Sequence, residues 1–161
     1  MSGLPYSGKT TLRKKLEKRL KFQVVSVDQI MTENNLWREG HPTQEDWNVA
    51  YAEAYSQLKN YLKKGKTTIF DCGNLPFHER ENARKIADSV GATHKLIYVN
   101  TPKEEILHRR EVNKETKERG HLDQDMMDTA IKMFQEPDKN ECPIIYNHQT
   151  NLDQWIRDNI K

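Results

Sequence analysis

The sequence has little of what marks secreted, membrane or zinc-binding proteins. It contains two cysteines, Cys72 and Cys142, in 161 residues, and no closely spaced cysteine and histidine set of the kind that binds zinc. No apolar run approaches the roughly 18 residues that cross a membrane, and the chain does not open with the apolar stretch of a signal peptide. We therefore expect a cytoplasmic protein with reduced thiols and no membrane partner.

The chain also lacks an excess of charge of one sign. Its formal net charge is +2, from 26 basic and 24 acidic residues, so no global field favours a nucleic-acid partner. Charged residues make up 31% of the chain and hydrophobic residues 35%. This composition is typical of a polar, globular protein, and its length predicts a single domain over residues 1–161.

The first residues carry a phosphate-loop pattern: a glycine, four residues, then glycine, lysine and a hydroxyl residue. In such a loop, which we call the phosphate loop (residues 3–11), backbone N–H groups point inward at phosphate oxygens. Lys9 would reach the terminal phosphates and the Thr10 hydroxyl would bind Mg²⁺. The pattern predicts that the nucleotide is held by Gly3, Ser7, Gly8, Lys9, Thr10 and Thr11.

A phosphate loop normally follows a buried strand of about five residues. Here Met1 and Ser2 alone precede Gly3. We therefore expect the first strand to be missing from the recorded sequence: either the recorded start lies downstream of the true one, or the sheet lacks its middle strand.

Apolar, β-branched runs alternate with amphipathic segments along the rest of the chain. The alternation predicts an α/β fold with a mostly parallel sheet flanked by helices. The expected strands are residues 22–27, 66–70, 94–99 and 143–146. The expected helices include residues 10–21, 43–64, 76–89, 123–135 and 151–160, with another that begins near residue 102.

Two aspartates follow predicted strands. Asp28 comes after residues 22–27, and Asp71 comes after residues 66–70. Ligands of α/β sheets bind at the carboxyl ends of the strands, so we predict that Asp28 accepts the proton of a substrate hydroxyl. Asp71 is predicted to act with Thr10 on the metal. Asp28 could also cap the helix that follows it, and the two roles are compatible.

Arginines near the middle of the chain could neutralise phosphate charge, because a guanidinium binds two oxygens and stays charged. Arg109 is predicted to be catalytic, and Arg110 and Arg119 to contact the nucleotide. The alternative for Arg109 and Arg110 is an exposed helix face paired with Glu105 and Glu111.

Taken together, these motifs resemble the small phosphate-loop kinases, the group around phage-type polynucleotide kinase, zeta toxins and chloramphenicol phosphotransferase. The segments that carry the resemblance are residues 3–11, 25–28, 68–75 and 98–110. The resemblance implies a three-layer phosphate-loop nucleoside triphosphate hydrolase fold with a short helical lid near residues 113–122. It matches Asp28 to the residue that orients the acceptor, residues 71–74 to the turn after the third strand, and Arg109 and Arg110 to the arginines of the helix that enters the lid.

The sequence thus predicts a kinase that uses ATP and Mg²⁺ to phosphorylate a hydroxyl of a small molecule. Asp28, Asn74 and Arg80 are the candidate substrate contacts. Many relatives have an arginine three positions after the catalytic aspartate, where it contacts an anionic substrate, whereas this chain has Met31. This difference makes nucleic acid the less favoured acceptor. A nucleotide-binding protein without turnover and a nucleic-acid 5′-hydroxyl kinase remain the alternatives, and the oligomeric state is open.

Overall fold

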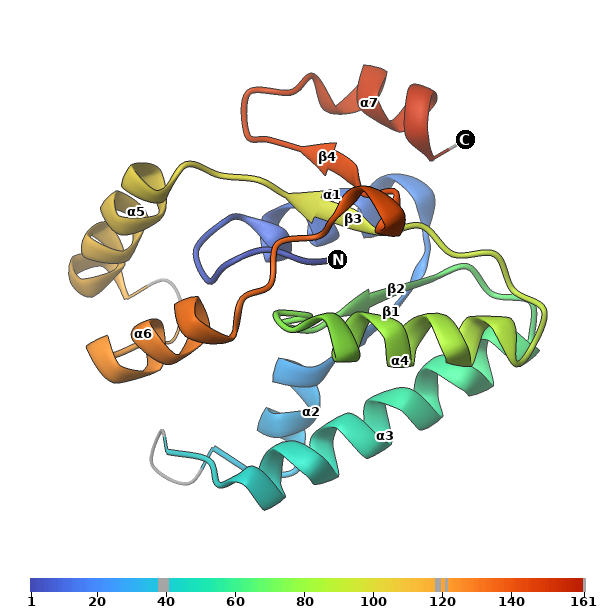
Figure 1. The fold of residues 1–161 in the computed structure, drawn as a ribbon, viewed down its shortest axis with the longest axis horizontal. Coiled ribbons are helices and arrows are strands. Elements are labelled where there is room, and N and C mark those ends of the chain that lie inside the picture. Colours follow the sequence, from blue (N-terminus) through green and yellow to red (C-terminus); the bar gives the residue numbers. More distant parts are fainter. Residues whose placement is uncertain (38–40, 118–119, 121, 161) are drawn as a thin grey trace. The chain divides into compact units, whose positions relative to one another are not determined.

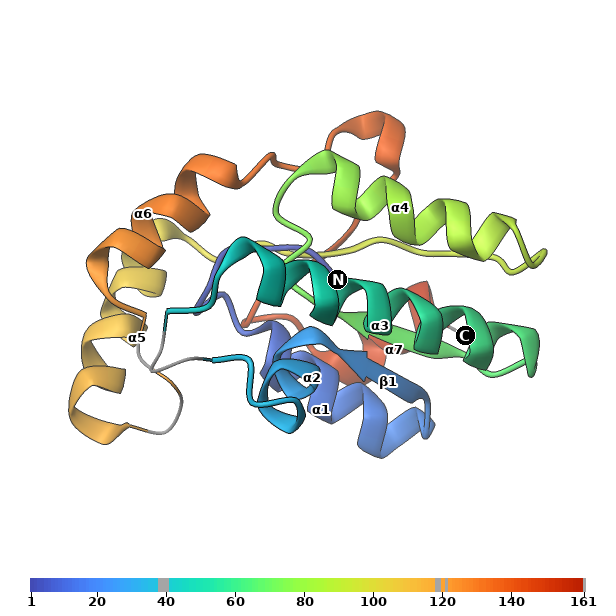
Figure 2. The same ribbon diagram turned by 90° about the horizontal axis from the view of Figure 1, so that it is seen from below.

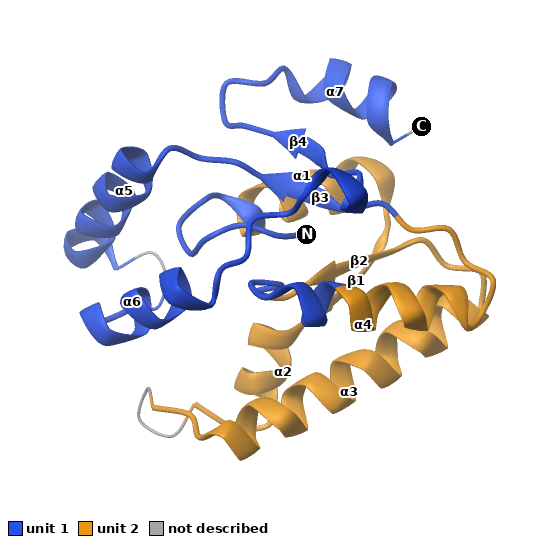
Figure 3. Ribbon diagram, in the orientation of Figure 1, with its two compact units in different colours: residues 1–9, 73–80, 95–161 blue, residues 10–72, 81–94 orange. Residues whose placement is uncertain are grey.

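The structure is a computed structural model that describes residues 1–37, 41–117, 120 and 122–160. The chain divides into two compact units, shown in Figure 3. Unit 1 comprises residues 1–9, 73–80 and 95–161, and unit 2 comprises residues 10–72 and 81–94. The prediction of a single domain over residues 1–161 stays a prediction.

Unit 2 is built on two parallel strands, β1 (Gln23–Ser26) and β2 (Thr68–Asp71). In their register Gln23 lies opposite Thr68 and Ser26 opposite Asp71. The helices of this unit are α2 (Val27–Glu33), α3 (Gln44–Lys63) and most of α1 (Lys9–Leu20) and α4 (Phe77–Asp88). Helices α2 and α3 pack side by side (Figures 1 and 2). Their shared core includes Val25, Ile30, Met31, Ala50, Ala54, Leu58 and Phe70.

Local signals fix the ends of the helices in unit 2. Thr43 and Asp46 form a capping box at the start of α3, as the spacing predicts. Gly65 follows this helix with φ of 67°, a left-handed conformation that suits glycine. At α2 the N-cap is Ser26, whose hydroxyl accepts a hydrogen bond from Gln29 N. The alternative role of Asp28 as the helix cap is therefore wrong, and Asp28 lies in the first turn of α2.

Unit 1 contains a second parallel pair, β3 (Ile97–Val99) and β4 (Ile144–Tyr146). Its helices are α5 (Lys103–Thr116), α6 (Gln124–Met133), the 3-10 helix η2 (Lys139–Glu141) and α7 (Leu152–Asn159). Helix α7 packs against the last strand, where Trp155 Nε1 donates to Ile145 O at 2.8 Å. A small buried cluster of Tyr6, Ile106 and Met127 joins the phosphate loop to α5 and α6.

The residue before the phosphate loop pairs with β3. Ser2 N donates to Ile97 O at 2.8 Å, and Val99 N donates to Ser2 O at 2.9 Å. These bonds make an isolated parallel bridge between Ser2 and Tyr98. In the described part of the chain, this bridge stands where the sequence pattern leads us to expect a first strand.

The predicted α/β architecture is confirmed: each of the four predicted strands is present, and the strand pairs β1–β2 and β3–β4 are both parallel. The third strand is shorter than predicted, since it begins at Ile97 rather than at residue 94.

Cys72 is buried and Cys142 is exposed, and both thiols are free. Within the described ranges, no helix is both long and apolar enough to cross a membrane.

Candidate active site

The backbone of the phosphate loop requires glycine at two points. Gly3 has φ of 148°, and a Cβ built on it would lie 2.7 Å from Val99 O. Gly8 has φ of 102°. A side chain at either position would be strained, and at Gly3 it would also collide with the strand behind the loop. The two glycines of the motif are therefore explained by the structure.

Lys9 begins α1 and folds back along the loop. Its Nζ donates to Gly3 O at 2.7 Å and to Leu4 O at 2.9 Å, so its charge is held beside the turn that binds phosphate in this motif. Thr10 and Thr11 follow in the first turn of the helix and are exposed. Their hydroxyls are thus accessible to a ligand at the N-terminus of α1, where the helix dipole favours anions.

Ser7 contributes an unsatisfied polar atom to the loop. The residue is 2% exposed, and its Oγ has no hydrogen-bond partner among the described residues. A buried hydroxyl without a partner is unfavourable by about 1–3 kcal/mol. The loop therefore offers an unused donor at a position where an anion would accept it, which fits the nucleotide phosphates that the motif implies.

Arg109 lies against the outside of the phosphate loop. Its Nη1 donates to Tyr6 O at 3.3 Å and to Ser7 O at 3.2 Å, and its Nε donates to Glu105 Oε1 at 2.7 Å. The hydrogen bond from Arg109 lowers the pKa of the Glu105 carboxyl. Arg109 therefore holds the phosphate loop by donating to carbonyl groups of the loop. Thr101 does the same, since its hydroxyl donates to Ser7 O at 2.7 Å.

Arg110 is directed elsewhere. It is 6% exposed, and it donates from Nε to Leu122 O and from Nη1 to Gln124 Oε1. The two guanidinium groups therefore have different partners. That of Arg109 binds the phosphate loop, whereas that of Arg110 lies at the junction of α5 and α6. Arg119 and part of the expected lid lie outside the described residues.

Asn74 forms a buried turn after β2. It has φ of 46°, and its Nδ2 donates to Met1 O at 2.8 Å while its carbonyl accepts from Ser2 Oγ at 2.9 Å. The Asn74 Oδ1 atom is buried and has no partner in the part of the chain that the structure describes. The turn is thus fastened to the residues before the phosphate loop, and one of its acceptors remains unused.

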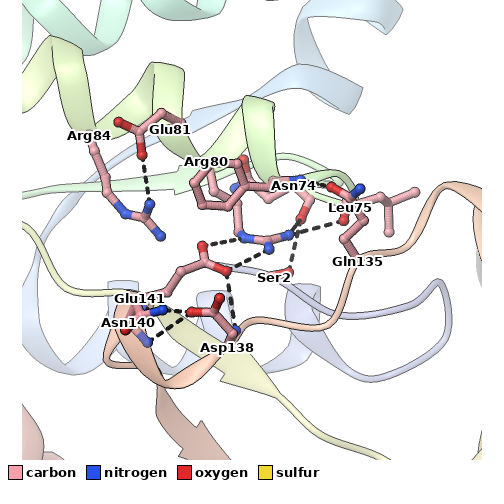
Figure 4. Close-up of polar contacts among 11 residues, drawn as sticks. Ser2, Asn74, Leu75, Arg80, Glu81, Arg84, Gln135, Asp138, Asn140 and Glu141 are labelled. Atoms are coloured by element: carbon pink, nitrogen blue, oxygen red, sulfur yellow. Dashed lines mark hydrogen bonds and ion pairs between the residues drawn. The ribbon is translucent and has the colours of Figure 1, made fainter.

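Arg80 supports this turn from α4, as Figure 4 shows. Its Nε and Nη2 each donate at 2.7 Å to the carboxylate of Glu141, and its Nη1 donates to Asn74 O and Leu75 O. The Arg80 and Glu141 side chains are 2% and 3% exposed, respectively. Arg80 was predicted to contact a substrate, but its guanidinium donates hydrogen bonds to Glu141, Asn74 and Leu75.

Glu141 is a residue of this site that sequence reasoning missed. It lies 61 residues from Arg80, so no local spacing connects the two. Residues 138–141 do carry a signal, because Asp138 and Glu141 form the capping box of η2. That box could have predicted the turn, although not the ion pair.

The two candidate carboxylates lie at the same edge of unit 2. Asp71 ends β2 directly opposite Ser26, and Asp28 follows Ser26 by two residues on the exposed face of α2. Asp71 is 8% exposed, and Arg13 Nε donates to its Oδ2 at 3.0 Å. Arg13 also donates to Glu17 Oε2 at 2.9 Å. Sequence reasoning missed this pair.

An aromatic pair, Trp37 and Trp47, lies beside α2. Trp37 Nε1 donates to the Thr32 hydroxyl at 3.0 Å, and the Trp37 and Trp47 rings meet edge to face at 5.8 Å. Met31, three positions after Asp28, is fully buried. That position therefore presents no charge to a ligand.

Comparisons with known proteins agree on the family. A family model described as an AAA domain matches residues 1–137. A shikimate kinase of Clostridium botulinum (strain Loch Maree / Type A3) is 32% identical over 148 residues, which cover 88% of this chain and 78% of that protein.

Solved kinase structures share the fold. A sugar kinase from Janibacter sp. HTCC2649 aligns over 98% of this chain and 88% of its own, with a TM-score of 0.70 and 20% identity. The Mycobacterium tuberculosis APS kinase, solved with AMPPNP and APS, aligns over 99% of this chain and 92% of its own, with a TM-score of 0.71 and 17% identity.

Proposed function

Because this chain belongs to the AAA domain family of small phosphate-loop kinases, we propose that it transfers the γ-phosphoryl group of ATP to a hydroxyl of a small molecule. The observation that carries this proposal is the phosphate loop itself. Its glycines, the folded-back Lys9 and the unused Ser7 hydroxyl form a turn with donors for a phosphate chain.

In the proposed reaction the acceptor oxygen forms a bond to the γ-phosphorus as the bond to the leaving ADP oxygen breaks. Asp28 accepts the proton of the acceptor hydroxyl, for which its exposed position in the first turn of α2 is suitable. Lys9 and the loop N–H groups neutralise the charge that spreads over the transferred group. Arg109 keeps the loop in shape from its carbonyl side.

Magnesium would be held by few protein groups. No set of three His, Cys, Asp or Glu side chains that could bind a metal occurs among the described residues, and Mg²⁺ commonly takes one or two protein ligands together with phosphate oxygens. Thr10 and Asp71 are the residues that we propose for this role. When bound, Mg²⁺ would offset the negative charge of the phosphates.

The acceptor is proposed to be a small hydroxylated compound. The relatives named above are kinases of shikimate, a sugar and APS, which are all small molecules. The buried Met31 lacks the positive charge that would bind a nucleic-acid phosphate. The Trp37–Trp47 pair beside α2 provides an apolar surface on which such a compound could pack.

The test is to measure ADP release from Mg–ATP across a panel of alcohols and sugars, with Asp28→Asn and Lys9→Met as variants. We expect Asp28→Asn to bind ATP normally and to lose transfer, and Lys9→Met to lose turnover by about 100-fold or more. Lys15→Met, on the exposed face of α1, is the matched control for Lys9. Binding of ATP with no ADP above background would identify a nucleotide-binding protein without turnover.

A further inference from the structure

Tyr6 stands in the phosphate loop with an unusual backbone. Its φ is 62°, in the left-handed region that is unfavourable for a residue other than glycine. The residue is nevertheless 4% exposed, with its ring in the cluster formed with Ile106 and Met127. A strained backbone conformation persists only where the surrounding contacts hold it, and such residues are concentrated at functional sites.

The hydroxyl of Tyr6 reaches the start of α6. It accepts a hydrogen bond from Leu122 N at 3.1 Å, across 116 residues of sequence. Leu122 is the residue before Asp123, the N-cap of α6. The amide of the α5–α6 junction is therefore satisfied by a side chain of the phosphate loop.

Tyr6 is bonded directly to Arg109 of α5 and is linked to Arg110 through Leu122. Arg109 Nη1 donates to the Tyr6 carbonyl, while Arg110 Nε donates to the carbonyl of Leu122. Arg110 also donates to Gln124 at the first turn of α6. Tyr6 is thus bonded to α5 through its backbone and to the α5–α6 junction through its side chain.

From this geometry we propose that Tyr6 is a positioning residue that couples the phosphate loop to the α5–α6 junction, so that the junction sets part of the affinity for nucleotide. This inference rests on the proposed nucleotide site. The bond from Leu122 and the apolar cluster hold Tyr6 in its left-handed conformation. Without them a larger share of molecules would have a loop that cannot bind phosphate, and the apparent affinity falls in proportion to the competent fraction.

Coupling of this kind is reciprocal. If the junction stabilises the binding form of the loop, a nucleotide in the loop must stabilise the junction by the same factor. The Leu122 amide should therefore exchange its hydrogen more slowly when a nucleotide is bound. A residue that only fills a core would not produce this dependence on ligand.

Tyr6→Phe is the most direct variant, because it keeps the ring and removes the hydroxyl. We expect AMP-PNP, with Mg²⁺, to bind this variant about tenfold more weakly than the wild type, the factor for loss of one hydrogen bond. Hydrogen exchange followed by mass spectrometry should show about tenfold faster exchange at the start of α6, and less additional protection on adding AMP-PNP. Tyr146→Phe, which changes a buried tyrosine of β4, is the matched control and should match the wild type.

Tyr6→Gly separates coupling from simple strain. Glycine adopts positive φ readily, so this variant removes the strain together with the contacts. Coupling predicts weaker nucleotide binding than in Tyr6→Phe. Binding equal to or tighter than that of the wild type would overturn the proposal, as would unchanged exchange and affinity in Tyr6→Phe. If the wild type itself does not bind AMP-PNP, the proposed function fails, while exchange of the Leu122 amide without nucleotide still decides whether the hydroxyl bond holds the junction.

Discussion

Arg13 and Asp71 form an ion pair in which Nε of the arginine lies 3.0 Å from Oδ2 of the aspartate. Their side chains are 16% and 9% exposed, so the pair is largely shielded from water. Arg13 stands four residues after Lys9 in α1, and Asp71 is the last residue of β2. The carboxylate that we propose for the metal is therefore already oriented by a helix that begins in the phosphate loop.

Arg13→Met should lower the free energy of unfolding by up to about 3 kcal/mol, because it leaves the Asp71 carboxylate shielded and unpaired. Urea denaturation of the variant measures this loss. Lys14→Met, on the exposed side of the same helix, should stay within about 0.5 kcal/mol of the wild type. Equal stability of the two variants would show that the pair contributes nothing.

The Arg80–Glu141 pair should be more sensitive to loss of one partner than to loss of both. Glu141→Gln leaves a guanidinium that is 2% exposed without its counter-charge, and we expect a loss of about 3–5 kcal/mol. The double variant Arg80→Met with Glu141→Leu should recover part of that stability, because it removes the unpaired charge while Asn74 O and Leu75 O lose the Arg80 donor.

Glu81→Gln serves as the control for the Arg80–Glu141 experiment, since Glu81 pairs with Arg84 and is one-third exposed. Its effect on the melting temperature should be close to zero. A double variant that is as unstable as Glu141→Gln would contradict the expected order.

Gly3→Ala should prevent the phosphate loop from forming its observed turn. The added Cβ would lie 2.7 Å from Val99 O, on a backbone with φ of 148°. We expect nucleotide binding to be lost with a marked drop in melting temperature. Gly120→Ala is the contrast, because its Cβ would meet nothing within 4 Å, and normal binding by Gly3→Ala would show that the loop can adjust.

Tyr98 should be among the last tyrosines to ionise. Burial raises its pKa to about 12, and the nearby negative charge of Glu136 adds to this. Because the folded state keeps the proton more tightly than the unfolded state, this contribution to stability is complete below pH 10 and is lost as the pH rises to 12. Absorbance titration at alkaline pH should show a late step that Tyr98→Phe removes, and the variant should lose less stability over that interval.

Local patterns were enough to predict much of this fold. The phosphate loop, the strand end at Asp71 and the cap of α3 at Thr43 are each encoded within a few neighbouring residues. Asp28 was expected directly after a strand, whereas β1 ends at Ser26 and Asp28 lies in the first turn of α2. The family is shown by the matches described above. The roles of Asp28, Asp71 and Lys9 in turnover stay predictions.

The charged pairs could not be predicted in this way. Arg13 and Asp71 are 58 residues apart in sequence, and a basic residue in a basic run gives no sign of which neighbour it will meet. Arg109 and Arg110 illustrate the same limit at short range. Adjacent residues in a helix point about 100° apart, so at most one of them could face the loop, and only the packing of α5 against Tyr6 decides which.

The unequal accessibility of the two cysteines has a practical consequence. Cys72 is buried at 5% exposure, whereas Cys142 is exposed and directly follows Glu141. A maleimide dye should therefore label the native protein at a single position without any engineered cysteine. Fluorescence from that dye would report on η2, whose Glu141 binds the Arg80 that donates to the Asn74 turn. It would therefore give an optical signal for structural changes in the turn that follows β2.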